Sequence, residues 1–213
     1  MTRRRPTPPL AVEACEPRAL LTLVFVLNGN SFNAAKPNAL TANAASVLRA
    51  AGAQVVQLGN PKIGSPAALA ALANQIGHQA HGRAVGIVGF SAGGALALRL
   101  AATPGLKVNA VLDYYGVPDV RAYLGRHPGT TNPIAGLAPF RAPLVARLSG
   151  PVATPARVVA AFGAADPHVD ADASRADLLA DAPGAAVYTY DGGHGVAIDA
   201  SRPALADFLA HLG

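Results

Sequence analysis

Residues 85–100, VGIVGFSAGGALALRL, decide the fold that this sequence predicts. They read as a short apolar strand, a glycine-rich turn and a run of residues that favour helix. Within them, residues 89–93 (GFSAG) fit the G-x-S-x-G pattern of a nucleophile elbow, in which a serine sits on a sharp strand-to-helix turn. Glycine suits the positions two residues before and after the serine, because a β-carbon would have no room there. The stretch therefore predicts an α/β fold with Ser91 at the start of a helix.

A five-residue motif is weak evidence in a chain with 22 glycines. The alternative is an ordinary strand-to-helix turn in which the Ser91 side chain caps the helix. Phosphate binding is disfavoured, because Gly86, Gly89 and Gly93 lack the spacing of a dinucleotide-binding motif and the sequence has no Gly-Lys-Ser/Thr loop. If Ser91 is the nucleophile of a hydrolase with such an elbow, an acid and then a histidine must follow it downstream, each after a strand.

The downstream sequence contains both residues in that order. Residues 157–162 (RVVAAF) read as a buried strand followed by Asp166, and residues 186–190 read as a strand followed by His194. Since the carboxyl ends of parallel strands share one edge of a sheet, Ser91, Asp166 and His194 are expected to meet there. The prediction is a serine nucleophile, a histidine base and an aspartate that orients the histidine.

Asp170 and Asp191 are alternatives for the acid. Asp166 is favoured over Asp170, because Asp170 falls within what should be the next helix. It is favoured over Asp191, because Asp191 precedes His194 by only three residues. His168 lies close to Asp166 in the chain, and the sequence assigns it no role.

Four motifs together resemble the α/β-hydrolase superfamily and, within it, the dienelactone hydrolase family. They are residues 89–94 (GFSAGG), residues 113–116 (DYYG), Gly163-x-x-Asp166-x-x-Val169 and Tyr190-x-x-Gly193-His194-Gly195. The serine and histidine motifs are shared by the whole superfamily, whereas the other two point to the narrower family. Dienelactone hydrolases proper use a cysteine nucleophile, so Ser91 supports ester hydrolysis more than it supports dienelactone as the substrate.

The resemblance also implies an oxyanion hole, a pair of N–H groups that stabilise the negative oxygen formed during acyl transfer. The expected donors are the backbone N–H groups of Ala92 and of Asn30, which lies in the polar loop after the first strand. For Asn30, a plain Asn/Gly turn explains the sequence equally well.

The alternation of strand and helix breaks between residues 114 and 155, where proline and glycine are frequent and only short helices, near 119–124 and 142–148, are expected. An irregular stretch of this length is usually functional, and the superfamily places a lid or substrate-binding excursion here. Candidates for the substrate pocket are Phe32, Tyr115, Leu137 and Phe140, although core packing explains each of them singly.

Elsewhere the pattern predicts one domain over residues 18–213, preceded by a tail over residues 1–17. Strands are expected at residues 20–27, 53–58, 83–89, 108–113, 157–162 and 186–190. Helices between them require parallel pairing, which predicts a single doubly wound, mostly parallel sheet with helices on both faces and a trimmed N-terminal edge. Ser201, two residues before Pro203, is expected to cap the final helix.

The composition excludes several classes of protein. With 51% hydrophobic and 14% charged residues, the chain is not largely disordered. The net charge of +5 owes three charges to Arg3, Arg4 and Arg5, so a nucleic-acid surface is not expected. One cysteine and scattered histidines predict no metal, and no cofactor is expected. The apolar run at residues 19–27 is too short to span a membrane, and we expect a cytoplasmic protein.

These observations favour a hydrolase of small acyl esters or lactones that acts through an acyl-enzyme. An acyltransferase, thioesterase or lipid-directed hydrolase would use the same three residues. A catalytically silent binding module would keep the fold alone. The sequence leaves the oligomeric state open.

Overall fold

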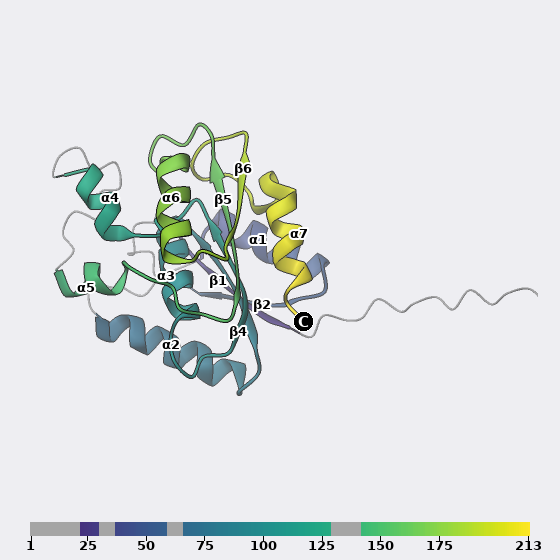
Figure 1. The fold of residues 1–213 in the computed structure, drawn as a ribbon. Coiled ribbons are helices and arrows are strands. Elements are labelled where there is room, and N and C mark those ends of the chain that lie inside the picture. Colours follow the sequence, from purple (N-terminus) through teal and green to yellow (C-terminus); the bar gives the residue numbers. More distant parts are fainter. Residues whose placement is uncertain (1–21, 30–36, 59–65, 129–141) are drawn as a thin grey trace, which may run out of the picture.

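The computed structural model describes residues 22–29, 37–58, 66–128 and 142–213 (Figure 1). Its centre is a six-stranded sheet in the order β2-β1-β3-β4-β5-β6, in which each neighbouring pair is parallel. The strands are β1 (Leu23–Leu27), β2 (Gln54–Leu58), β3 (Val85–Phe90), β4 (Val108–Tyr114), β5 (Arg157–Gly163) and β6 (Ala186–Tyr190). The predicted strand number, parallel pairing and single sheet are confirmed.

Helices cover both faces of this sheet. They are α1 (Ala39–Ala50), α2 (Pro66–Ala80), α3 (Ala92–Ala101), α4 (Val120–Arg126), α5 (Ala142–Arg147), α6 (Ala171–Asp181), the 3-10 helix η3 (Ile198–Ser201) and α7 (Arg202–Ala210). Figure 1 shows α1 and α7 on one face and α2, α3 and α6 on the other. None of the described helices is long and apolar enough to cross a membrane.

The sheet divides the hydrophobic core into two layers. Leu72 of α2, Leu96 of α3 and Leu178 of α6 belong to one layer. Leu48 of α1 and Phe208 of α7 belong to the other. The central strands β1 and β3 are buried along their whole length, which explains why their sequences are continuous apolar runs instead of alternating patterns.

Helix α3 lies unusually deep, and all ten of its residues are buried. Glycines permit this close approach. A β-carbon on Gly89 would collide with the backbone of Gly93, and one on Gly93 would lie 2.7 Å from the carbonyl oxygen of Asn28. The strand that carries the turn and the helix that follows it are therefore packed backbone to backbone.

The chain order places a topological switch point beside this turn. From β1 the chain moves outward to β2 and then crosses to β3 on the other side of β1. The connections that follow β1 and β3 consequently run to opposite faces of the sheet, and such a switch point is where open α/β sheets bind ligands. Ser91 directly follows β3, and residues 28–29 directly follow β1.

The excursion predicted at residues 114–155 contains α4 and α5, and its residues 129–141 lie outside the described part. Arg99 of α3 forms hydrogen bonds with both described parts of the excursion, one on each side of residues 129–141. The Arg99 guanidinium donates to the carbonyl oxygens of Pro118 and Gly150, at 2.6 Å each. The tail predicted at residues 1–17 also lies outside the described residues, so the domain bounds and the lid stay predictions.

Candidate active site

Ser91 occupies a strained position between β3 and α3. Its φ of 51° and ψ of −118° lie in a region that side chains rarely adopt, and its N–H donates to the carbonyl oxygen of Tyr114 at 2.9 Å. The Ser91 side chain makes no capping hydrogen bond to α3. The alternative in which this serine merely caps a helix is therefore disfavoured, because its hydroxyl points elsewhere.

The Ser91 hydroxyl points at His194, which lies in the loop after β6. The distance from Ser91 Oγ to His194 Nε2 is 3.0 Å, and His194 Nδ1 lies 2.7 Å from Asp166 Oδ2. A carboxylate can only accept a hydrogen bond, so the Nδ1–H of His194 donates to Asp166. In the neutral imidazole, Nε2 then carries no proton and accepts from the Ser91 hydroxyl. The structure thus brings the three predicted side chains together in one hydrogen-bonded row.

Asp166 is held in the turn after β5, and its side chain is fully buried. Its Oδ1 accepts from the backbone N–H groups of His168 and Val169, at 2.8 and 3.0 Å. Burial alone would raise the pKa of Asp166, but the hydrogen bonds from His194 and from these two N–H groups outweigh it and lower that pKa. The carboxyl therefore stays ionised beside the imidazole.

The two other acids considered from the sequence lie elsewhere. Asp170 caps α6, because its Oδ1 accepts from the Ala173 N–H at 2.7 Å. Asp191 is exposed. Asp166 is the acid that contacts His194.

The backbone after β1 reaches Ser91, as an oxyanion hole requires. A β-carbon on Gly29 would lie 3.3 Å from Ser91 Cβ. Ala92 is the first residue of α3, where backbone N–H groups lack partners within the helix. Asn30, Phe32, Leu137 and Phe140 lie outside the described residues, and their roles stay predictions.

Tyr115 and His168 both contact the His194 ring. Tyr115 is 1% exposed, and its ring centroid lies 4.6 Å from that of His194. His168 is exposed and meets His194 edge-on at 5.2 Å. The sequence assigned His168 no role; its place two residues after the acid is the signal that would have found it.

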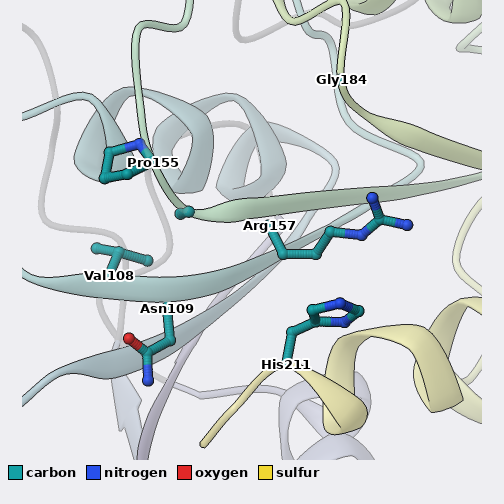
Figure 2. Close-up of a pocket in the computed structure, with 7 residues that line it drawn as sticks. Val108, Asn109, Pro155, Arg157, Gly184 and His211 are labelled. Carbon is teal, nitrogen blue, oxygen red and sulfur yellow. The ribbon is translucent and has the colours of Figure 1, made fainter.

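A hollow lies at the amino ends of β4 and β5, opposite the strand ends that carry Ser91 (Figure 2). Its volume is about 520 Å³, and its lining residues are Val108, Asn109, Pro155, Ala156, Arg157, Gly184 and His211. Arg157 is paired with Asp207, and the Asn109 amide donates to the carbonyl of Leu212. We find no group of three or more metal-ligating side chains in the described residues.

Solved structures define the class of fold. A carboxylesterase from Lactobacillus plantarum is 21% identical, with a TM-score of 0.62 over 82% of this chain and 73% of that one. An acetyl ester-xyloside bifunctional hydrolase from Caldicellulosiruptor lactoaceticus is 16% identical, with a TM-score of 0.65 over 89% and 80%. Est1E from Butyrivibrio proteoclasticus is 13% identical, with a TM-score of 0.65 over 88% and 85%. The fold is that of the α/β-hydrolases.

The family follows from the sequence. The model of the dienelactone hydrolase family matches residues 34–204, and the chain belongs to this family. It is a carboxylic ester hydrolase, as the resemblance of its motifs implied. No curated protein matches the sequence significantly.

Proposed function

We propose that the protein is a serine hydrolase that cleaves small carboxylic esters or lactones through an acyl-enzyme on Ser91. One observation above all supports this: two hydrogen bonds, of 3.0 and 2.7 Å, link the Ser91 hydroxyl through His194 to a buried carboxylate. A serine hydroxyl is a poor nucleophile near neutral pH, and it needs a base within this distance.

In the proposed reaction, His194 Nε2 takes the proton from Ser91 Oγ as that oxygen attacks the ester carbonyl. The imidazolium that results is stabilised by Asp166 and then gives its proton to the leaving alkoxide. Water attacks the acyl-enzyme in the second half of the cycle, with His194 again as base. A lactone reacts in the same way, except that its alcohol stays attached to the acyl group.

The developing oxyanion would be bound by the N–H of Ala92 and by the N–H of Asn30. The contact between Gly29 and Ser91 supports this assignment, because it brings the chain that leads to Asn30 beside the nucleophile. Removing one such donor in a serine protease costs about 2.7–4 kcal/mol of transition-state stabilisation. The nucleophile, base and oxyanion donors all come from the chain, so the reaction draws on no cofactor.

The names of similar structures guide the choice of substrate. They include a carboxylesterase and an acetyl ester-xyloside hydrolase, and short acyl esters are therefore the substrates to test first. This mechanism gives no information on the cellular compartment, and the cytoplasmic location stays a prediction.

Ser91→Ala tests the proposal directly. We expect kcat for p-nitrophenyl acetate to fall by about 10⁶-fold and labelling by a fluorophosphonate probe to disappear, because the attacking oxygen is gone. Ser174→Ala, which changes a buried serine on α6, serves as the control and should leave both readouts unchanged. Residual turnover by a folded Ser91→Ala protein at the wild-type rate would overturn the proposal.

A further inference from the structure

Tyr115, which directly follows β4, carries two features that oppose folding. Its φ of 43° places a bulky side chain in the left-handed region of the backbone, where strain is expected. Its hydroxyl is buried and has no hydrogen-bond partner among the described residues. Burial also raises the pKa of this phenol, so the hydroxyl stays neutral. Costs of this kind persist where the surrounding structure requires the side chain at that place.

The Tyr115 ring packs against two aromatic rings of the core. Its centroid lies 5.3 Å from that of Tyr114 and 5.8 Å from that of Phe90, and both of these rings are fully buried. The Tyr115 N–H also donates to the carbonyl oxygen of Ala161 at 2.8 Å. The ring that touches His194 is therefore a rigid surface.

His194 needs such a surface, because its own loop has no regular structure and its side chain is 20% exposed. The hydrogen bonds at Nδ1 and Nε2 hold the two ends of the imidazole but leave the ring free to tilt about the line between them. The buried Tyr115 ring meets the imidazole at 4.6 Å between centroids, with 56° between the planes. The exposed His168 meets it edge-on at 5.2 Å.

We propose that Tyr115 is a positioning residue: its ring fixes the tilt of the His194 imidazole, so that one nitrogen faces Ser91 while the other faces Asp166. This inference rests on the function proposed for those three residues. The positioning role explains the strained backbone, because the turn at residue 115 brings the Tyr115 ring into contact with His194. It assigns the effect to the ring and none of it to the hydroxyl.

Tyr115→Leu and Tyr115→Phe separate these contributions. Tyr115→Leu should lower kcat for p-nitrophenyl acetate about 100-fold, the loss that a misplacement of about 1 Å brings, and should change KM less than about threefold. The downfield proton NMR resonance of the His194 Nδ1–H should broaden or disappear, with His194→Gln used to assign it. Tyr115→Phe should restore both readouts to wild-type values.

Phe208→Leu is the matched control, because Phe208 is a fully buried aromatic residue in the same layer of the core but lies on α7. It should lower the thermal stability while leaving kcat and the resonance unchanged. If Tyr115→Leu does not fold, Tyr115→Gly replaces it, since glycine adopts a positive φ without strain. The inference is overturned if the variant without the ring keeps wild-type kcat, if Phe208→Leu shows the same loss, or if Tyr115→Phe fails to restore activity.

Ser91→Ala, assayed in parallel, keeps the two proposals distinguishable. Activity in that variant would overturn the serine mechanism whatever Tyr115 does. An inactive Ser91→Ala protein together with a fully active Tyr115→Leu protein would leave the mechanism standing and would reject the positioning role.

Discussion

Two aspartates of the molecule, one in the turn after β5 and one on α7, each contact a histidine, but the two clusters differ in what else surrounds the carboxylate. Asp166, at the carboxyl ends of the strands, accepts from His194 and from two backbone N–H groups. Asp207, on α7, accepts a bidentate pair from Arg157, at 3.1 and 2.7 Å, and a bond from the Tyr188 hydroxyl at 2.9 Å. Its histidine, His211, lies 3.1 Å away with its side chain 48% exposed.

The difference shows why an Asp–His contact alone is no active site. The guanidinium of Arg157 is a permanent countercharge for Asp207, and its hydrogen bonds are the main cause of the lowered pKa of that carboxyl. Among the described residues, the donors to Asp166 besides His194 are two neutral backbone N–H groups. The charge of Asp166 is therefore available to stabilise an imidazolium when one forms, as the serine mechanism requires.

Within this comparison, the largest expected effect is the loss of kcat in Asp166→Asn, which is compared with the same substitution at Asp207. Asp166→Asn should lower kcat by about 10⁴-fold, the loss caused by the equivalent change in a serine protease, because an amide favours the wrong tautomer of His194. KM should change little, since the histidine acts in the transition state. Steady-state kinetics with p-nitrophenyl acetate measure both constants.

Asp207→Asn is the counterpart. It should keep kcat within about twofold of the wild type while the free energy of unfolding falls by about 1.5–3 kcal/mol, the range for hydrogen bonds to charged groups. Urea unfolding at pH 7 measures the loss. A drop in kcat as large as that of Asp166→Asn would show that the two clusters do not differ as described.

Asp113 provides a third carboxyl for this comparison. It is buried, and within the described part of the chain neither a histidine nor a cation is bonded to it. It lies on β4 and is fully buried against Gly94 and Gly116, whose missing β-carbons leave room for it. Burial raises the pKa of Asp113 to about 7, and the Gly116 N–H and the charge of Arg99 oppose this only in part. Where Asp166 and Asp207 stay ionised, Asp113 takes up a proton near neutral pH.

This raised pKa predicts a pH-dependent stability. The folded state binds the Asp113 proton more tightly than the unfolded chain, whose carboxyl has a pKa of about 3.9. Stability is therefore lost as the pH rises from about 4 to about 7, by about 1.4 kcal/mol per pH unit and about 4 kcal/mol in all. Asp113→Asn, which stays neutral, should match the wild type at pH 4 and exceed it by that amount at pH 8.

Urea unfolding of both proteins across this pH range provides the measurement. Taking the difference between them removes the contributions of the other acids. A stability difference that does not vary with pH would mean that Asp113 is ionised in the folded protein throughout.

Much of the site was predictable because each residue lies within four residues of the end of a predicted strand. Ser91, Asp166 and His194 stand after β3, β5 and β6, and parallel strands bring such positions to one edge. The contact between Tyr115 and His194 was not predictable, since it depends on a positive φ and on packing between residues far apart in the chain. Local sequence patterns indicate neither the positive φ of Tyr115 nor its packing against His194.

The prediction for Ser201 was wrong in its detail, and the reason is similar. Ser201 does occupy the position before α7, but its side chain makes no capping bond. Its backbone N–H instead donates to the Tyr114 hydroxyl at 2.8 Å. A tertiary contact from the core strand β4 thus replaces the local capping bond that the sequence suggested.

The smallest effect concerns Asp170, the acid closest to Asp166 among the alternatives. Its carboxylate accepts from the Ala173 N–H, so Asp170→Ala should lower the free energy of unfolding by about 1 kcal/mol through loss of the α6 cap. Asp170→Ser, which can still cap, should recover most of that loss. Both variants should keep wild-type kcat, because no bond links Asp170 to His194, whose Nδ1 is already held by Asp166. If Asp170→Ala instead lost activity on the scale of Asp166→Asn while remaining folded, the acid of the mechanism would have to be reassigned to the helix cap.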